Sequence, residues 1–336
     1  MTKLGVGLIS CGVMGTSLAK ACNELEHARI VAVSDIDKEK AEKLAKELNA
    51  PYDLDYHNLL GRKDVEAVIV ASPGFLHREM TVAAAKTKKH VFSEKPMATN
   101  LADCDAMIAA CREAGVKLMV GQVCRFHGVH SKVKELASSG EMGKPTCMMV
   151  ARIGGGWGGV WAQSWRMSLA KSGGALMEIN AHEIDFMRFV CGDVQSVQAV
   201  GGKYRQLDAD YPDIALVSLR FKSGAVGLLH SSMATAIGAY GGRVDCANGS
   251  INFPSIWGKD AGITYGKFGE AAKTIPAADI KVELPVRHEL RCFVDAVLKD
   301  ETPAVPGEEG RAAVEVAVAA YRSIETGKPV ELPLRG

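Results

Sequence analysis

A chain of 336 residues is too long for one ordinary domain and long enough for two, and its 47% hydrophobic and 24% charged residues are typical of globular proteins. Its formal net charge of +1 leaves no electrostatic footprint for nucleic acid or an anionic membrane surface, so neither is expected as a partner. No stretch approaches about 18 consecutive apolar residues, so no transmembrane helix is expected.

The amino-terminal residues 3–9 have too short an apolar run for a secretory signal and no small-residue cleavage site, so they predict a buried first strand. The nine cysteines are scattered, odd in number, and contain no Cys-x-x-Cys pair. This pattern predicts neither disulfides nor a zinc site, and no metal is expected. Free thiols are typical of a reducing compartment, so we expect a cytoplasmic protein.

The first third of the chain alternates short apolar runs with helix-like stretches. Such alternation predicts an α/β fold, with a doubly wound parallel sheet in a Rossmann domain over residues 1–123. The expected strands are 6–10, 30–34, 67–71, 90–92 and 117–120, and the expected helices are 15–25, 38–48, 78–86 and 102–114.

After residue 123 the pattern changes, and β-rich runs predict a second α/β domain over 124–336 with an open, mostly antiparallel sheet. Its two terminal helices are free to pack back on the first domain. We expect helices at 131–138, 174–191, 287–299 and 307–326, strands at 146–152, 196–201, 215–221 and 225–232, an irregular loop at 153–168, and a hairpin turn at Asn248-Gly249.

The first predicted strand runs into a short turn that opens a helix. Ser10 stands where the dinucleotide-binding fingerprint has its first glycine, whereas Gly12 and Gly15 keep the other two. Gly12 lets the backbone approach a pyrophosphate, and Gly15 allows close packing of helix on strand. Asp35 ends the next strand, where a carboxylate accepts hydrogen bonds from both adenosine ribose hydroxyls and repels the extra phosphate of NADP. The pattern predicts NAD rather than NADP, although Asp35 also suits a solvated helix cap.

Two further predicted strands of the first domain end in polar residues, Ser72-Pro73 and Glu94-Lys95-Pro96. Ligands of open α/β sheets bind at the carboxyl ends of the strands. A residue before proline is held extended, which fixes the direction of the Lys95 side chain. We expect Lys95 to meet the reacting hydroxyl or carbonyl near the nicotinamide; the alternative is a surface lysine at a strand end.

The predicted helix 174–191 is largely apolar but carries ionisable residues. Glu178, His182 and Asp185 fall on one stripe at about 100° per residue. Ionisable groups on a buried helix need a partner or a function. A metal site is one candidate, but no second histidine follows His182 at the metalloprotease spacing. We favour an acid–base histidine oriented by a carboxylate, and a satisfied core histidine is the alternative.

Hydride transfer from an alcohol to a nicotinamide requires a group that takes the hydroxyl proton as the hydride leaves. A lysine in a desolvated cleft or a histidine can do this near neutral pH. Lys95 and His182 are both candidates, and the sequence does not decide which is the principal acid or base.

Several stretches resemble the family of glucose–fructose oxidoreductase, inositol dehydrogenase and the rhizopine catabolism protein (Gfo/Idh/MocA). They cover essentially the whole chain, and the Glu-Lys-Pro segment is specific in combination with the Gly-Gly…His helix. The stretches are residues 10–15, 33–37, 72–73, 76–77, 90–96, 120–126, 173–185, 306–310 and 327–333.

The resemblance implies a Rossmann domain followed by an α/β domain whose open sheet commonly forms dimers or tetramers. It assigns the Glu-Lys-Pro lysine to Lys95, the acid–base histidine to His182, and the carboxylate four residues earlier, often Asp in the family, to Glu178. These three are the expected catalytic residues. The residues expected to bind NAD include a Trp-Arg pair found near the nicotinamide in sugar-acting members; they are Ser10, Gly12, Val13, Met14, Gly15, Asp35, Ser72, Pro73, His77, Glu94, Lys95, Gln122, Trp165 and Arg166.

The second domain is expected to select the substrate. Tryptophan faces stack on the apolar face of a sugar ring and arginines bind vicinal hydroxyls, which favours a cyclic polyol or a pyranose over a small keto acid. Aromatic loop residues also serve simple packing. The expected substrate contacts are Lys95, Arg125, Arg152, Trp157, Glu178 and His182, with His127, Trp161 and Trp165 near them.

The sequence thus predicts NAD-dependent oxidation of a hydroxyl of a sugar, anhydrosugar or inositol-type polyol by a homodimer or homotetramer. The first alternative is an NAD-retaining glycosidase, lyase or isomerase that uses transient oxidation. The second is a redox-sensing binding protein without turnover, and the presence of both Lys95 and His182 argues against it.

Overall fold

The computed structural model describes residues 3–205, 208–256 and 261–334. Within these residues the chain divides into two compact units. The first unit comprises residues 1–123 and 283–312, and the second comprises 124–282 and 313–336. The helix Pro285–Leu298 therefore belongs to the first unit, although in sequence it follows most of the second unit.

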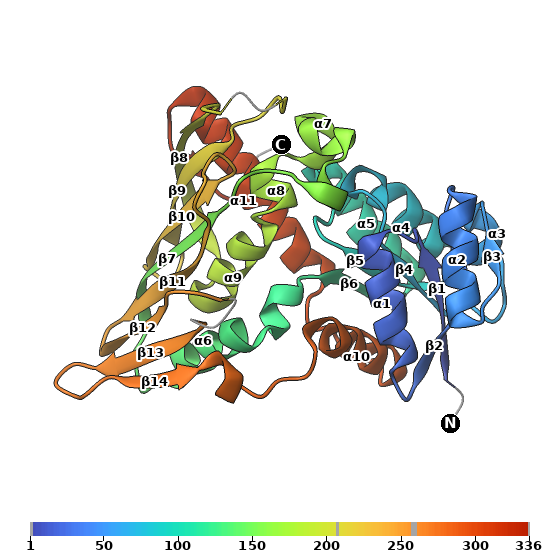
Figure 1. Ribbon diagram of the computed structural model, residues 1–336, viewed down its shortest axis with the longest axis horizontal. Coiled ribbons are helices and arrows are strands. Elements are labelled where there is room, and N and C mark those ends of the chain that lie inside the picture. The colour runs from blue at the N-terminus through green and yellow to red at the C-terminus, as the bar shows by residue number, and fades with distance from the viewer. Residues whose placement is uncertain (1–2, 206–207, 257–260, 335–336) are drawn as a thin grey trace. The chain divides into compact units, whose positions relative to one another are not determined.

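The first unit is built on a six-stranded sheet in the order β3-β2-β1-β4-β5-β6 (Figure 1). All its strand pairs are parallel, which confirms the predicted doubly wound sheet. The strands β1 and β4 are buried along their full length, which explains their continuous apolar sequences. The bounds are β1 Leu4–Ile9, β2 Ala28–Ser34, β3 Tyr52–Asp53, β4 Ala67–Val70, β5 His90–Glu94 and β6 Leu118–Gly121.

The helices of the first unit follow the predicted alternation with the strands. The helix α2 matches its predicted bounds because Asp37 caps it and Asn49 ends it in a left-handed conformation. The elements β3 and α3 are not predicted from the sequence, because they are too short to show a period. The bounds are α1 Val13–Asn23, α2 Lys38–Leu48, α3 Tyr56–Leu60, α4 His77–Lys86, α5 Leu101–Ala114 and α10 Pro285–Leu298, with the 3₁₀ turn η1 Gly74–Leu76.

The second unit holds a nine-stranded sheet in the order β14-β13-β12-β11-β7-β10-β9-β8-β15. Among the described strands of this second sheet, only β10 and β7 pair in parallel, so the sheet is mostly antiparallel, as predicted. The bounds are β7 Pro145–Ile153, β8 Val194–Gly202, β9 Ile214–Phe221, β10 Val226–Ser232, β11 Ala239–Cys246, β12 Gly249–Phe253, β13 Gly262–Lys267, β14 Lys273–Pro276 and β15 Val330–Glu331.

The predicted hairpin joins β11 to β12, but its turn lies one residue earlier than expected. Cys246 pairs with Gly249, so Ala247 and Asn248 form the turn and Gly249 already belongs to the strand. A Cβ on Gly249 would meet the backbone oxygen of Gly266 at a distance too short for a real contact. The glycine is therefore required by close strand packing rather than by the turn itself.

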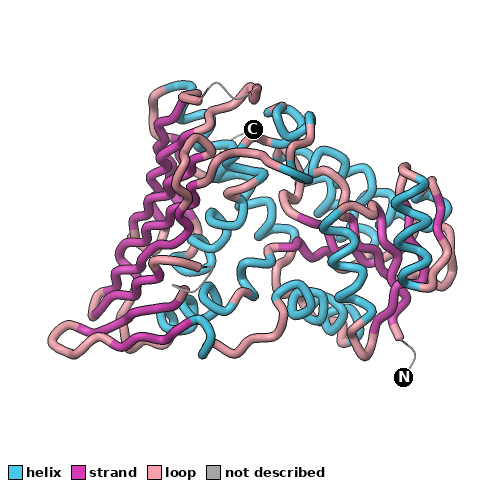
Figure 2. Tube along the Cα trace, in the orientation of Figure 1, coloured by secondary structure: helices cyan, strands magenta, loops and turns pink. Residues whose placement is uncertain are grey.

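The helices of the second unit lie against one face of this sheet, as the cyan and magenta segments of Figure 2 show. Within this unit, no described helix covers the opposite face (Figure 1). The bounds are α6 Gly128–Ser138, α7 Leu169–Ser172, α8 Ala175–Glu178, α9 Ala181–Cys191 and α11 Gly307–Thr326, whose first residues belong to the first unit, with the 3₁₀ turns η2 Val123–Phe126, η3 Gly159–Trp161, η4 Ser164–Met167 and η5 Ala277–Asp279.

The single helix predicted over 174–191 is wrong, because it is interrupted after Glu178. The backbone N–H groups of Ile179 and Asn180 both donate to the carbonyl oxygen of Ala175, at 3.0 Å each, so one turn is widened. The side chain of Asn180 is tied to neighbours, since it accepts the hydroxyl of Ser231 at 2.6 Å. The regular helix resumes with α9, so the predicted single stripe does not hold across the break.

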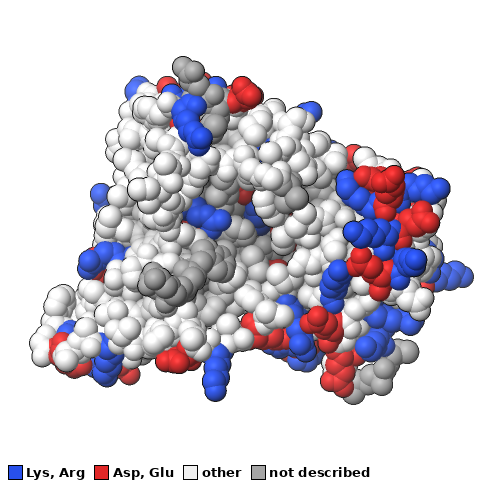
Figure 3. All heavy atoms as spheres, viewed as in Figure 1, with Lys and Arg blue, Asp and Glu red and all other residues white. Residues whose placement is uncertain are grey.

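Charged side chains of both signs gather over α1, α2 and α3 on the face drawn in Figure 3. They belong to helix surfaces turned to solvent, and one such pair joins Lys20 to Glu47 at 2.7 Å. In the described parts of the chain, no helix is both long enough and apolar enough to cross a membrane.

Candidate active site

The turn between β1 and α1 brings its backbone close to the helix it opens. A Cβ on Gly15 would lie far inside contact distance of the Ser10 carbonyl oxygen, so only glycine fits there. A Cβ on Gly12 would meet nothing nearer than the Ser10 hydroxyl at 4.0 Å. The fold therefore requires Gly15, whereas the space above Gly12 is left open at the amino terminus of α1, where an anion is favoured.

Asp35 is fixed beside this turn by two backbone donors. Its Oδ2 accepts the N–H of Cys11 at 2.7 Å, and its Oδ1 accepts the N–H of Asp37 at 2.8 Å. The cap of α2 is Asp37, which accepts the N–H groups of Glu39 and Lys40. The alternative that Asp35 serves as a helix cap is therefore wrong, and its carboxylate is held where the fingerprint needs one.

The ends of β4 and β6 each present a buried polar side chain. Ser72 is 9% exposed and Gln122 is 1% exposed. Neither the Ser72 hydroxyl oxygen nor the Gln122 amide oxygen has a hydrogen-bond partner in the described part of the chain. Buried polar atoms without partners are costly, and these two lie at the carboxyl ends of strands that flank β5.

His77 braces the ends of β4 and β5 from inside the first unit. Its Nε2 lies 2.7 Å from the Ser72 carbonyl oxygen, and its Nδ1 lies 2.9 Å from that of Pro96. The residue is completely buried, and this burial lowers its pKa although the two carbonyl groups oppose the shift. A neutral ring donates through one nitrogen only, so His77 donates a hydrogen bond to one of the two carbonyl groups and lies against the other.

The Glu94-Lys95-Pro96 segment leaves the end of β5, with a cis peptide bond between Lys95 and Pro96. Glu94 is 5% exposed, and its Oε2 accepts the backbone N–H of Lys95 at 2.9 Å. Lys95 itself is partly exposed. The backbone that carries the Lys95 side chain is thus held by its own neighbour.

These features of the first unit fit a bound dinucleotide. Gly12 leaves a cradle that a Cβ would fill, Asp35 offers a fixed carboxylate, and Ser72 and Gln122 supply buried polar atoms in need of partners. Ser10, Val13 and Met14 belong to the same turn and the first turn of α1. The NAD-binding role of each named residue stays a prediction.

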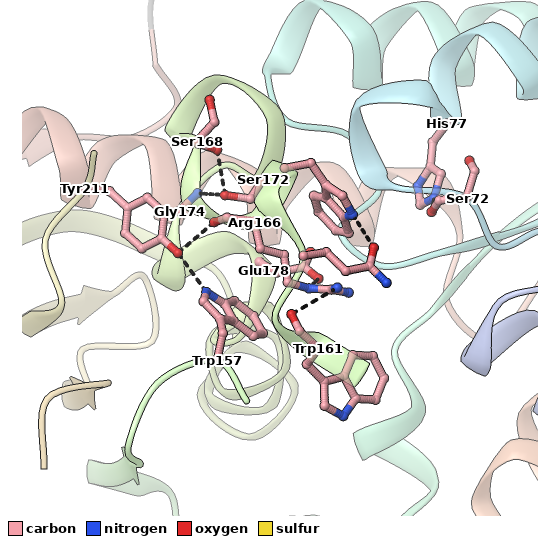
Figure 4. A network of polar contacts seen from close by, with 12 residues as sticks. Ser72, His77, Trp157, Trp161, Arg166, Ser168, Ser172, Gly174, Glu178 and Tyr211 are labelled. Atoms are coloured by element: carbon pink, nitrogen blue, oxygen red, sulfur yellow. Dashed lines mark hydrogen bonds and ion pairs between the residues drawn. The ribbon is translucent and has the colours of Figure 1, made fainter. Parts of the chain in front are cut away.

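In the second unit three tryptophan rings surround the guanidinium of Arg166, as Figure 4 shows. The Arg166 Cζ lies 4.2 Å from the ring centre of Trp165, and 5.2 Å from those of Trp157 and Trp161. Arg166 is 8% exposed, and its Nε donates to the Glu178 Oε1 at 3.1 Å. A desolvated cation with three aromatic faces and one carboxylate is firmly held.

Tyr211 anchors this cluster from one side, at the left of Figure 4. Its hydroxyl donates to the Arg166 carbonyl oxygen at 2.8 Å and accepts the Trp157 indole N–H at 2.9 Å. The ring is 1% exposed and packs with Ala175, Ala209 and Met233. The loop 153–168, predicted to be irregular, is therefore pinned at both the arginine and a tryptophan.

Two glycines set the start of α8. Gly173 and Gly174 have φ values of +73° and +72°. A Cβ on Gly174 would clash with the hydroxyl of Tyr321, which accepts the N–H of Leu176 at 3.0 Å. The Gly-Gly pair therefore fixes the direction in which Glu178 leaves the helix.

His182 lies in the first turn of α9 and is partly exposed, above a buried polar network. The next residue, Glu183, is completely buried; it accepts the Asn180 side-chain N–H at 2.9 Å and lies 3.6 Å from Arg152. Arg152 stacks over the ring of Tyr240 at 4.2 Å. The network supports the backbone that carries His182.

Arg125 and Asp185 form a paired unit. The Arg125 side chain is 8% exposed and makes two hydrogen bonds to Asp185, at 2.7 and 2.6 Å. Asp185 therefore holds an arginine, and it follows His182 by three residues on the same helix α9. The predicted substrate contacts of Arg125 and Arg152 stay predictions.

Three residues of these sites are not predicted from the sequence. Glu183 and Asn180 lie among apolar neighbours next to His182, and a polar residue in such a setting is a signal that could have been read. Tyr211 stands far along the chain from its partners, and no local pattern identifies it.

Comparison with known proteins agrees with this geometry. Residues 4–122 match a family model described as an oxidoreductase family with an NAD-binding Rossmann fold, GFO_IDH_MocA. Residues 130–252 match the carboxyl-terminal domain of the same family. Both matches fall on the folded units described above.

The chain is 30% identical to myo-inositol 2-dehydrogenase of Thermotoga maritima, over 97% of its own length and 98% of that protein. It is 36% identical to 2,7-anhydro-N-acetylneuraminate hydratase of Mediterraneibacter gnavus, over 68% of its own length and 61% of the hydratase. Among solved structures it is similar to the aldose-aldose oxidoreductase from Caulobacter crescentus complexed with glycerol, with a TM-score of 0.88, 28% identity, and coverage of 98% of this chain and 100% of that one.

Proposed function

The chain belongs to the Gfo/Idh/MocA family of NAD-binding oxidoreductases, and from this premise we propose that it is a dehydrogenase of a sugar, anhydrosugar or inositol-type polyol. The observation that carries the substrate class is the set of three tryptophan rings held around Arg166. Flat aromatic faces next to a fixed cation suit a ring with one apolar face and a rim of hydroxyls. The likeness to a myo-inositol 2-dehydrogenase along the whole chain supports the same class.

The chain's own residues would bind the substrate and handle its proton. Bound NAD would accept the hydride from the carbinol carbon. Lys95 and His182 are proposed to hold the hydroxyl and take its proton, and Glu94 keeps the Lys95 backbone in place. Glu178 is proposed to act on the substrate indirectly, because it fixes the Arg166 side chain with a hydrogen bond.

The specific alternative is a net reaction without oxidation, in which transient hydride removal drives an elimination. The likeness to a 2,7-anhydro-N-acetylneuraminate hydratase supports keeping it, although the match spans 61% of that protein. The two functions differ in one product. A dehydrogenase accumulates NADH, whereas the alternative consumes its substrate at constant NADH.

The test is a screen of polyols, aldoses and anhydrosugars with NAD and, in parallel, NADP. We expect NADH to accumulate with at least one cyclic polyol or sugar. Faster reduction of NADP than of NAD would contradict the role given to Asp35. Consumption of a substrate without NADH would support the alternative.

Alanine variants of Lys95 and His182 test the proton-handling roles. Each should lower kcat by about 10²-fold or more, because general acid–base groups contribute about that much. If the two act as one unit, the double variant should lose little more than either single variant. Lys171→Ala, on the neighbouring exposed surface, is the control and should leave kcat unchanged. Binding of substrate and NAD without any turnover in the wild type would favour a binding protein instead.

The uncovered face of the nine-stranded sheet is proposed to join two copies of the chain. Val200, Leu216 and Val226 are 63%, 40% and 45% exposed. Val200 pairs with Leu216 across β8 and β9, which places both on one face. Leu216→Lys should dissociate the oligomer in sedimentation experiments, while Leu298→Lys, on an exposed helix end, should not. A monomeric wild type would contradict the proposal.

A reducing, cytoplasmic location is proposed from the thiols. All nine cysteines are free, and seven are buried. Secretion of the active protein through an oxidising compartment would argue against this location.

A further inference from the structure

Glu289, on α10, is an enclosed carboxyl group that the proposed reaction leaves unused. The residue is 0% exposed, and neither carboxyl oxygen has a hydrogen-bond partner in the described part of the chain. Burial of an unpaired carboxylate is costly, so such a group keeps its proton or shares one.

The packing of α10 on the sheet brings Glu289 towards Glu94. The rings of Phe92 and Phe293 meet edge to face with their centres 5.8 Å apart. Glu94 follows Phe92 by two residues on the same face of β5. Glu289 precedes Phe293 by four residues on the same face of α10. Two strand residues advance about 6–7 Å and four helical residues about 6 Å, so Glu94 and Glu289 lie at similar distances from the Phe92–Phe293 contact on the facing sides of β5 and α10.

Glu94 is also enclosed, and it is tied to the lysine of its own motif. Its Cδ would lie 3.4 Å from a Cβ built on Gly121, the residue that pairs with it on β6. Its Oε2 accepts the backbone N–H of Lys95. Burial, and next to it the charge of Glu94, raise the pKa of Glu289 well above its usual value. Burial and the charge of Glu94 thus both favour the protonated form of Glu289.

Among the described residues, burial and the charge of Glu94 are the two influences that raise the pKa of Glu289. The basic groups of α10 and of α1, which packs beside it, are drawn to other carboxylates, and burial raises the pKa of the neighbouring thiols. The groups on these elements are Lys20, Cys22, Glu283, Arg287, His288, Arg291, Cys292 and Asp295.

We propose that Glu289 donates its carboxyl hydrogen to Glu94, and that this pair positions Lys95 through the backbone N–H that Glu94 accepts. Glu289 is a positioning residue, since it acts on the reacting atoms only through Glu94 and Lys95. Its effect on turnover rests on the proposed function of Lys95. The hydrogen bond between the two carboxyl groups does not.

The experiment compares Glu289→Gln with Glu289→Leu in the full chain. Glutamine keeps a donor of the same shape, whereas leucine fills the space without one. Asp295→Asn and Asp295→Leu are matched controls, because Asp295 lies on the same helix and is partly exposed. The readouts are hydrogen exchange of the Lys95 amide, thermal unfolding, and kcat with the substrate found in the screen. The exchange signal is clean because Pro96, which follows, has no N–H.

The leucine variant should melt at or above the wild-type temperature, because it removes a buried polar group. It should nevertheless exchange the Lys95 amide about tenfold faster and lose about tenfold in kcat, as expected for a loosened hydrogen bond. The glutamine variant should restore both to within about threefold. Both Asp295 variants should resemble the wild type. Wild-type exchange and kcat in the leucine variant would overturn the proposal.

If the leucine variant does not fold, the glutamine variant decides through pH. The wild type should lose thermal stability from pH 6.5 to 8.5, and Glu289→Gln should not; equal slopes would overturn the proposal. The exchange measurement needs no substrate. Faster Lys95 exchange without an effect of Lys95→Ala on kcat would therefore refute the proposed function and leave the carboxyl pair intact.

Discussion

Ser10 shows how one residue can meet a backbone requirement at a cost. Its φ is +80°, in the left-handed region that glycine adopts freely and serine rarely. The fingerprint places a glycine at this position, so the turn itself demands that conformation. The serine hydroxyl lies close to Gly12, where it lines the open cradle at the start of α1.

Ser10→Gly should therefore raise the free energy of unfolding, by about 0.5–1 kcal/mol, because it relieves the strained φ. Chemical denaturation measures the change. Ser17→Gly makes the same substitution inside α1, at an exposed helical position, and should destabilise by about as much. If both variants instead lowered the free energy of unfolding, the argument for strain at Ser10 would be wrong.

Asp35 and Asp37 have different hydrogen-bonding roles, which their positions in the sequence do not reveal. Both carboxylates accept backbone N–H groups, but Asp37 accepts those of α2, and Asp35 accepts that of Cys11 in the β1–α1 turn. The difference is one of orientation at the end of β2. It leaves Asp35 as the carboxylate beside the turn.

At the scale of elements, the β1–α1 turn contains two glycines that are needed for different reasons. Gly15 is required because the helix passes the Ser10 carbonyl oxygen, and Gly12 is not required by any neighbouring protein atom within 4.0 Å. Substitution of Gly15 should therefore destabilise the fold, whereas substitution of Gly12 should weaken only ligand binding.

Gly12→Ala should keep the melting temperature of the wild type but weaken NAD binding by about tenfold or more, because its methyl group fills the cradle. Gly15→Ala should lower the free energy of unfolding by about 2 kcal/mol or more, since the backbone must move. Calorimetric melting and NAD titration separate the two effects. Equal loss of stability in both variants would remove the argument for an open cradle.

The break between α8 and α9 is an element-scale feature with consequences for the site. The widened turn at Ile179 and Asn180 changes the angle between Glu178 and His182 from that of a continuous helix. Glu178 is instead directed to Arg166. At this break the Ser231 hydroxyl donates a hydrogen bond to the Asn180 side chain, and Ser231 is distant from Asn180 in the sequence.

At the scale of the whole molecule, buried titratable groups set the pH dependence of stability. Burial lowers the pKa of His77, and that of His130 to about 3. Below about pH 6.5 the unfolded chain binds protons at these rings that the folded chain does not, so stability falls as pH falls. The pKa of Glu289 is raised, so above about pH 4.3 the unfolded chain loses a proton that the folded chain keeps. That term lowers stability as pH rises.

The free energy of unfolding should therefore be largest near about pH 6.5, where the histidine term ends and the Glu289 term continues. Towards alkaline pH it should fall by about 1.4 kcal/mol per pH unit until Glu289 ionises. Denaturant titrations at intervals between pH 5 and 8.5 would measure both limbs. Glu289→Gln should remove only the alkaline limb, and an unchanged alkaline slope in that variant would contradict the assignment.

Much of the fold follows from patterns that local residues carry. The helices α2 and α11 match their predicted bounds, α2 because a capping residue marks each end, and the buried strands of the first unit are continuous apolar runs in the sequence. The short elements β3 and α3 were missed because they have no period to read. The glycine turn, Asp35 and the Glu-Lys-Pro segment could be found since each motif is contiguous or lies at a fixed spacing.

The sequence by itself determined the family, the Rossmann sheet, and the residue types that serve NAD chemistry, because periodicity and contiguous motifs are properties of neighbouring residues. Only the tertiary structure decided which partners those residues take. It paired Arg166 with Glu178, Arg125 with Asp185, and His77 with two loops. It also enclosed Glu289, 195 positions after Glu94 in the chain, within one unit. Such contacts depend on how segments distant in sequence pack together, and no local sequence pattern specifies that packing.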